Sequence, residues 1–111
     1  MLNVGSATRV FVATQPVDLR GSFNRLHALV SEVLRQDPLS GHLFCFTNRR
    51  GNRLKVLYWD GSGLWVCAKR LEKSKFQWPK HEEASLSLRG EEFVALISGL
   101  EVRQRPGWYR R

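Results

Sequence analysis

Residues 49–80 read RRGNRLKVLYWDGSGLWVCAKRLEKSKFQWPK, and this stretch decides most of the fold. Nine of the chain's 18 Lys and Arg residues lie in it against two acids, a net charge of +7 out of a formal +8 for the whole chain. It also contains three of the four tryptophans. Cations neutralise phosphates and rings stack on bases, so the composition is typical of a nucleic-acid surface. It fits equally a sheet with an aromatic core and solvated Lys and Arg, and both interpretations remain open.

Turn signals divide this stretch into strands. Residues 48–52 (NRRGN) and 60–63 (DGSG) are typical turns, with Gly51 free to take a positive φ and Asp60 a turn former rather than a catalytic acid. The sequence therefore predicts strands at residues 42–47, 54–59 and 64–71. A fourth, short strand is expected at residues 75–78, ended by Pro79. Consecutive strands joined by tight turns predict an antiparallel meander.

The expected hairpin register makes both faces of the sheet apolar. A four-residue loop at 60–63 pairs Trp59 with Leu64 and Tyr58 with Trp65. One face then carries Leu57, Trp59, Leu64 and Val66, and the other carries Val56, Tyr58, Trp65 and Cys67. An antiparallel sheet usually needs only one buried face, so the second must meet a helix, a partner subunit or a ligand.

The N-terminal half predicts a strand followed by a helix. Residues 9–14 (RVFVAT) favour a strand, and residues 19–36 repeat apolar residues at helical spacing. Gly21 moves the expected helix start towards Ser22, with Asp18 as the candidate N-cap. Asp37-Pro38 is expected to end the helix.

The C-terminal part is acidic and then basic. Residues 81–85 are interpreted as a polar linker, and a second helix is expected at about 90–100, with Ser87 and Arg89 both candidates for its N-cap. The tail at residues 102–111 is basic. Its arginines, with Trp108 and Tyr109, are either a second phosphate-and-stacking element or a solvated terminus.

These elements predict a small single α+β domain across residues 1–111, with a β-meander core at residues 42–79 of a sheet of four to five strands and two helices on one face. No signal peptide or membrane span is expected, which predicts a cytoplasmic protein with reduced thiols at Cys45 and Cys67. Scattered histidines and the lack of any catalytic motif predict no metal, no cofactor and no enzymatic activity.

Several motifs resemble one family along nearly the whole chain. Residues 37–79 are similar to the TnpB accessory proteins of the IS family 66 bacterial insertion sequences, above all in the runs SGHLF (40–44) and LYWDG (57–61) and in KRLE (69–72). The run PVDLR (16–20) followed by Phe23, and residues 88–100, resemble the same family. One departure is Gly21-Ser22, where the family typically has Lys-Gly, and this removes a positive charge beside Arg20.

The resemblance implies a small protein encoded beside a separate DDE transposase, which assists transposition without performing its chemistry. Together with the charge pattern it predicts DNA binding through the basic hairpin surface. The candidate residues are Arg49, Arg50, Arg53, Lys55, Tyr58, Trp59, Trp65, Lys69, Arg70, Lys73 and Lys75. Two alternatives remain open: a protein-interaction module that docks on the transposase or on a second copy, and RNA binding through the same surface.

Overall fold

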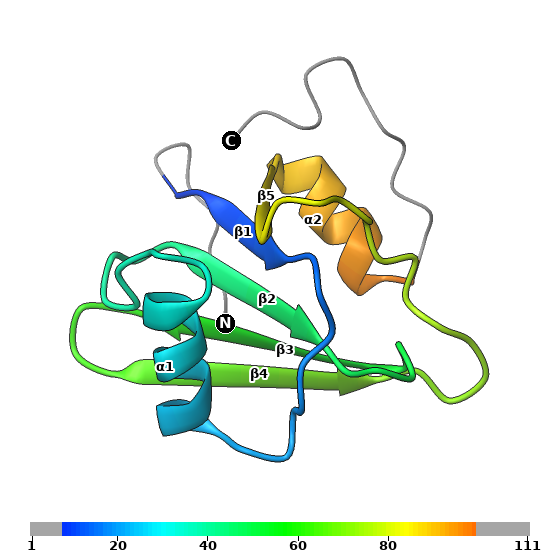
Figure 1. Cartoon of the computed structure of the whole chain (residues 1–111), viewed down its shortest axis with the longest axis horizontal. Helices are drawn as coiled ribbons and strands as arrows, with labels where there is room; N and C mark the ends of the chain where they lie inside the picture. Colours follow the sequence, from blue (N-terminus) through cyan, green and yellow to red (C-terminus); the bar gives the residue numbers. More distant parts are fainter. Residues whose placement is uncertain (1–7, 100–111) are drawn as a thin grey trace.

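The computed structural model describes residues 8–99. These residues form a five-stranded mixed sheet with one helix on each face (Figure 1). In chain order the elements are β1 (Val10–Ala13), α1 (Phe23–Glu32), β2 (Leu43–Thr47), β3 (Arg53–Trp59), β4 (Leu64–Arg70), β5 (Ser85–Leu88) and α2 (Gly90–Ile97). The strand order across the sheet is β4-β3-β2-β1-β5. The predicted α+β class is confirmed.

The meander of β2, β3 and β4 is confirmed with its register. Trp59 pairs with Leu64 and Tyr58 with Trp65, as expected from the turn at residues 60–63. At the other turn, Gly51 has φ +73° and its amide donates to the Asn48 carbonyl (3.0 Å). Short turns with a residue able to adopt positive φ therefore determine the pairing of these three strands.

A purely antiparallel sheet is the wrong expectation for β1. This strand lies between β2 and β5, pairing in parallel with β2 and antiparallel with β5. Two parallel neighbours need a crossover connection, and α1 provides it between β1 and β2. The strand–helix–strand order of the N-terminal half is thus a parallel unit attached to the meander.

The predicted strand at residues 75–78 is also wrong. The predicted polar linker at residues 81–85 is confirmed for residues 81–84, which lie in no helix or strand, whereas Ser85 begins a strand. Phe76 and Trp78 lie two residues apart and both pack into the core, which produces a strand-like alternation, but residues 75–78 pair with no strand of the described sheet. The fifth strand is instead β5, where Leu86 and Leu88 face the core in alternation with two serines. Residues 71–84 cross from one sheet edge to the other.

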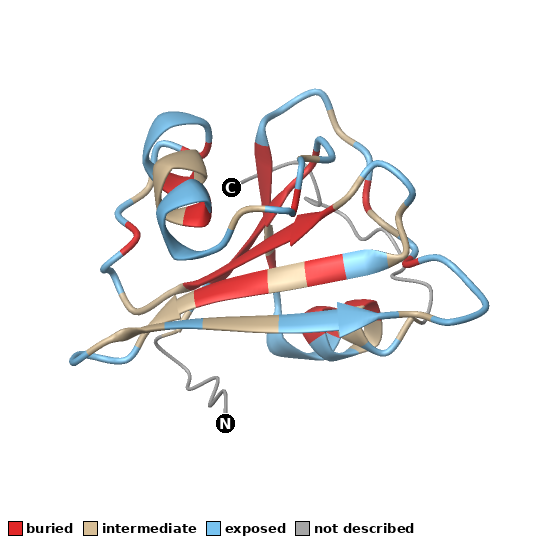
Figure 2. Cartoon of the chain, turned by 90° about the horizontal axis from the view of Figure 1, so that it is seen from below, coloured by how far each residue is buried: buried red, intermediate tan, exposed pale blue. Residues whose placement is uncertain are grey.

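The two helices cover opposite faces of the sheet, so the expectation that both lie on one face is wrong (Figure 2). Leu26 and Val30 of α1 pack with Phe44 and Leu57 on one side. Phe93 and Leu96 of α2 pack on the other, with a set that includes Val10, Val12, Cys45, Val56 and Leu86. The apolar patterning on both sides of β3 is explained by this three-layer arrangement.

The helix boundaries differ from the prediction. Ser22 occupies the N-cap position of α1, without a side-chain cap hydrogen bond, and Asp18 does not cap the helix. The helix ends four residues before Gln36, because Arg35 adopts a left-handed conformation (φ +56°) and the Gln36 amide returns to the Val30 carbonyl (3.1 Å). At α2 the N-cap is Arg89, whose amide donates to the buried carboxylate of Glu92 (2.7 Å).

The predicted basic tail at residues 102–111, and Leu100 of the predicted second helix, lie outside the described residues. Among residues 8–99 no helix is both long and apolar enough to cross a membrane.

Candidate nucleic-acid interface

The β3–β4 hairpin places its cations and its aromatics at opposite ends. Arg53 lies opposite Arg70 at one end, and Trp59 lies opposite Leu64 at the other. Six residues of extended chain separate the two ends, a distance of roughly 20 Å. The basic and aromatic side chains that alternate in the sequence therefore do not share one surface.

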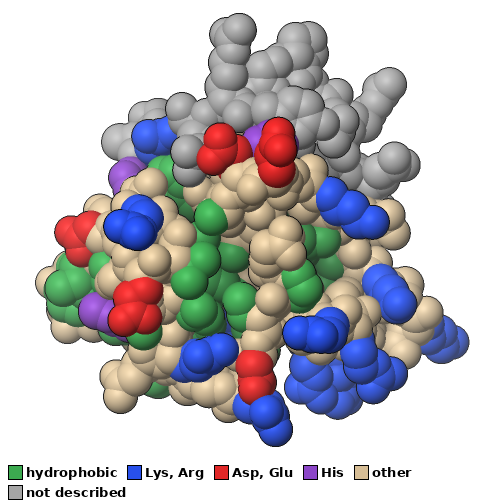
Figure 3. All heavy atoms as spheres, viewed as in Figure 1, with side chains coloured by type: hydrophobic (Ala, Val, Ile, Leu, Met, Phe, Trp, Pro, Cys, Tyr) green, Lys and Arg blue, Asp and Glu red, His purple; other side chains and the backbone are tan. Residues whose placement is uncertain are grey.

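The basic end of the hairpin is completed by the loop after β4. The Leu71 amide donates to the Asn52 carbonyl and the Phe76 amide to the Gly51 carbonyl, each at 2.8 Å, so residues 71–76 lie against the turn at 48–52. Lys75 packs beside Gly51. Figure 3 shows Lys and Arg side chains gathered at the lower right of the molecule, over this turn and loop. We call this surface the basic end; its candidate residues are Arg49, Arg50, Arg53, Arg70, Lys73 and Lys75.

Two of the predicted cations have structural partners. The Lys55 ammonium donates to the carbonyls of Leu19 (2.6 Å) and Gly21 (2.9 Å), which fastens the segment before α1 to β3. Lys69 points to the opposite face of the sheet and donates to the Ile97 carbonyl (2.7 Å) at the end of α2. A cation at a helix C-terminus stabilises the helix, so Lys69 contributes to the fold there.

The remaining cations of the basic end differ in how far they are neutralised. Arg70 forms an exposed ion pair with Glu72 (2.9 Å). Among residues 8–99, Arg49, Arg50 and Arg53 form no ion pair. These three guanidinium groups are exposed and keep their full hydrogen-bonding capacity.

The aromatic end is organised by Asp60. One carboxylate oxygen accepts the amides of Ser62 (2.8 Å) and Gly63 (2.9 Å), and the other accepts the indole N–H of Trp65 (2.7 Å). These donors, with the Trp65 N–H the strongest of them, hold the pKa of Asp60 well below its usual range. Trp65 is 54% exposed, whereas Tyr58 and Trp59 are half-buried on opposite faces. Of these three predicted aromatics, Trp65 has the most exposed ring.

A groove lies beside the basic end, between residues 16–20 and residues 48–55. It is an open cavity of about 800 Å³. Its lining residues are Pro16, Val17, Asp18, Leu19, Arg20, Asn48, Arg49, Arg50, Arg53 and Lys55. Arg20 is not among the residues predicted for the site, because the topology that brings it close to the hairpin turn cannot be read from neighbouring residues. Its one sequence signal was the PVDLR motif itself.

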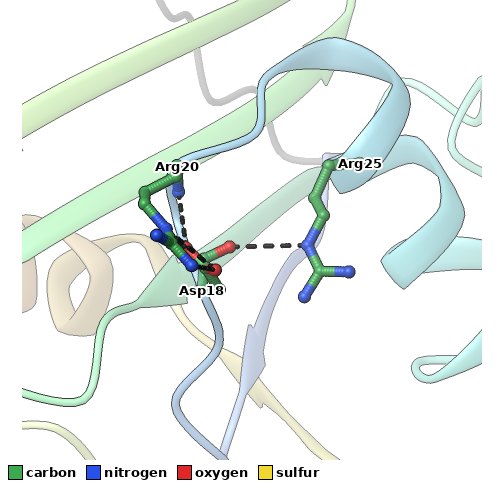
Figure 4. Close-up of polar contacts among 3 residues, drawn as sticks. All are labelled: Asp18, Arg20 and Arg25. Carbon is green, nitrogen blue, oxygen red and sulfur yellow. Dashed lines mark hydrogen bonds and ion pairs between the residues drawn. The ribbon is translucent and has the colours of Figure 1, made fainter.

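Asp18 and Arg20 form a bidentate ion pair at the rim of this groove (Figure 4). The Arg20 guanidinium donates through Nε (3.0 Å) and Nη2 (2.7 Å), and the Arg20 amide donates to the same carboxylate (2.9 Å). The side-chain contact with Arg20 is the main reason why the pKa of Asp18 lies well below its usual range. Arg25 reaches the Asp18 carbonyl (3.5 Å). The Asp18 carboxylate is therefore ionised, and its oxygen atoms already accept hydrogen bonds from Arg20.

Candidate catalytic groups stay apart within the part of the chain that the structure describes. No group of three or more His, Cys, Asp or Glu side chains there is placed to hold a metal ion. Both cysteines are free; Cys45 is fully buried, and burial raises the pKa of its thiol.

Comparison with known proteins decides the family. The family model described as IS66 Orf2 like protein matches residues 8–106. The chain belongs to the IS66 Orf2-like family. Membership makes it a transposition accessory protein of IS66-type insertion sequences, as the resemblance of residues 37–79 predicted.

Two relatives from Sinorhizobium fredii support this membership over almost the whole chain. The protein y4jC is 41% identical over 109 residues, covering 96% of this chain and 93% of its own length. The protein y4hO is 39% identical over 110 residues, covering 99% of this chain and 96% of its own. Both are described as uncharacterized. No solved structure matches the chain.

One departure from the IS66 Orf2-like pattern has a structural consequence. A Cβ atom at Gly21 would lie 2.6 Å from the Cβ of Arg25, which is too close for any side chain without a local shift. A lysine at this position would therefore require a local shift of Gly21 or of Arg25.

Proposed function

We propose that this IS66 Orf2-like protein assists transposition by binding DNA through its basic end, while the separate transposase performs the chemistry. The observation that carries the proposal is the convergence of cations from three segments: the turn at residues 48–52, the paired ends of β3 and β4, and the loop at residues 71–76. Three of these arginines have no carboxylate partner among residues 8–99.

Such a surface supports binding to the nucleic-acid backbone. Each phosphate neutralised by Lys or Arg releases condensed counterions, and this release favours binding whatever the base sequence. The aromatic end lies roughly 20 Å away, or about six base pairs along a duplex. Base contacts by Trp65 would thus involve a different part of the DNA from the phosphates held at the basic end.

The test is a salt series of binding by the whole chain. The DNA probes are the terminal inverted repeat of the element, an unrelated duplex of equal length and a single strand. We expect log K to fall steeply and linearly with log salt concentration for all three. The ratio between the two duplexes measures how far the protein distinguishes sequence.

Two outcomes would contradict the proposal. Absence of binding even at low salt would assign the positive charge to solubility or to an acidic protein partner. Complete displacement of DNA by an equal concentration of matched RNA would make RNA the ligand.

A second candidate function, docking on the transposase or on another copy of the chain, rests on the open edge of the sheet. The strand β4 is an edge strand, and its first five residues (LWVCA) carry no charge. The exposed Trp65 lies on this uncharged part. Edge strands of this kind accept an added strand. The expected results are co-purification with the transposase or a dimer mass by light scattering, and a strict monomer that fails to co-purify would exclude this function.

A further inference from the structure

The groove between residues 16–20 and residues 48–55 has walls that are held in place by hydrogen bonds. The Val17 amide donates to the Thr47 carbonyl (2.9 Å), which joins one wall to the other. The Lys55 ammonium reaches from β3 to the carbonyls of Leu19 and Gly21. On the opposite wall the Arg53 amide donates to the side chain of Asn48 (3.1 Å). The groove is therefore formed before any ligand arrives, which lowers the cost of binding.

The charge that lines the groove is strongly unbalanced. Five cations face one acid, a net charge of +4; they are Arg20, Arg49, Arg50, Arg53 and Lys55 against Asp18. The ion pair between Asp18 and Arg20 neutralises one cation and the only acid together. Lys55 is half-buried and bonds to uncharged carbonyl oxygens, so no described carboxylate neutralises its charge. A partly desolvated cation of this kind attracts an anion more strongly than a solvated one.

We infer that this groove is a phosphate-binding site, with Arg49, Arg50, Arg53 and Lys55 supplying the charge and Arg20 standing at its rim. The inference rests on the proposed function and deepens it, because it assigns one bound phosphate of the nucleic acid to the groove beside the basic end. The cavity of about 800 Å³ is larger than a phosphate group and leaves room for flanking sugars. In a nucleic acid this phosphate comes either from within a strand or from a phosphorylated strand end.

The test measures the affinity of the full chain for inorganic pyrophosphate by calorimetry, at constant ionic strength set with chloride. Replacing the exposed pair Arg50→Gln and Arg53→Gln should weaken binding at least tenfold. The charge-matched control is Arg35→Gln with Lys80→Gln, both exposed and outside the groove, and it should leave the affinity unchanged. Circular dichroism spectra of both double variants establish that they fold.

A second variant, which removes a negative charge instead of positive ones, should change the affinity in the opposite direction. Asp18→Asn removes the only acid of the groove, and its amide oxygen can still accept the Arg20 N–H groups. We expect pyrophosphate to bind several-fold tighter to this variant. Equal weakening in the groove and control variants, or no change with Asp18→Asn, would overturn the phosphate site.

The source of the phosphate is resolved with three single strands: 5′-phosphorylated, unphosphorylated and circular. Preference for the first assigns the groove to strand ends, and equal binding assigns it to internal phosphates. If DNA binds but pyrophosphate does not, the groove inference fails and the proposed function stands. If pyrophosphate binds and DNA does not, the groove stands and the proposed function fails.

Discussion

The two ends of the β3–β4 hairpin lie beside similar glycine-containing turns but differ in which side chains the hydrogen bonds of the turn engage. At the basic end, hydrogen bonds within the turn at residues 48–52 run between backbone groups and the two asparagines, and the arginine side chains are left open. At the aromatic end, Asp60 ties up the turn amides and the indole of Trp65. The first end leaves Arg49, Arg50 and Arg53 without an ion-pair partner among residues 8–99, while the second mainly stabilises the hairpin.

The contrast shows that residue type alone does not identify a binding surface. Cations and aromatic rings that follow one another along residues 49–80 are separated by the length of the hairpin. A cation can donate hydrogen bonds to a ligand only where the fold has not already used its N–H groups, although its positive charge still acts on the ligand when its partners are neutral carbonyls. Lys55 and Arg53 lie two residues apart on the same face of β3, yet only Lys55 is held by carbonyl groups.

The largest expected effect is on stability, and it compares Lys55, which hydrogen-bonds to two carbonyls, with Arg53 on the same face of β3. Lys55→Met should lower the free energy of unfolding by about 2 kcal/mol, because the Leu19 and Gly21 carbonyls lose a charged donor. Urea denaturation measures this loss. The control on the same face of the strand is Arg53→Met, which should change stability by less than about 0.5 kcal/mol. Equal midpoints for the two variants would show that Lys55 does not hold the segment before α1.

The next effect tests the basic end directly. Arg49→Ala with Arg50→Ala should weaken binding of all DNA sequences alike, by about tenfold at low salt, and reduce the slope of log K against log salt by about 2. The charge-matched control, Arg35→Ala with Lys80→Ala, should leave the slope unchanged. Unaltered affinity in the Arg49 and Arg50 variant would remove this turn from the interface.

The third effect concerns the aromatic end and depends on pH. The donors around Asp60 lower its pKa in the folded state, so its contribution to stability is complete above the ordinary value of 3.8 and is lost as the pH falls towards the folded pKa. Asp60→Ala should therefore lower the melting temperature at pH 7, and the gap to the wild type should shrink from about pH 4 downwards. Melting curves at several pH values measure the gap.

A constant gap at all pH values would mean that the ionised carboxylate is not what stabilises this turn. Asp60→Asn is the matched variant: it keeps one acceptor for the turn amides but has no charge. It should lie between the alanine variant and the wild type at pH 7.

The smallest expected effect is on DNA binding by the exposed aromatic. Trp65→Ala should change affinity for a single strand by less than about twofold, because the ring lies roughly 20 Å from the basic end. Stacking of one base on an aromatic ring contributes about 1–3 kcal/mol. A loss of affinity of about tenfold or more would therefore show that the aromatic end and the basic end belong to one DNA interface. Filter binding at low salt distinguishes the two results.

Much of the meander could be predicted because its information is local. The glycine-containing turns and the two-residue period of the strands fix which residues of β3 and β4 face each other, and the register of Trp59 and Leu64 follows. The exposure of Arg49 and Arg50 was likewise predictable, since side chains in a tight turn point away from the core. The groove was not predictable, because Arg20 and Arg53 line the same cavity only through the path of the segment between β1 and α1.

The sequence by itself determined the family, the α+β class, the hairpins and the concentration of positive charge in residues 49–80, because composition, turn residues and short-range periodicity are properties of neighbouring residues. Only the tertiary structure decided which face each helix covers, that β1 lies parallel to β2, and that Leu86 and Leu88 complete the sheet where residues 75–78 do not. It also decided which cations remain open. These outcomes depend on contacts between residues far apart in the chain, where burial of both sheet faces and the satisfaction of each polar group select one arrangement among several that the same local pattern permits.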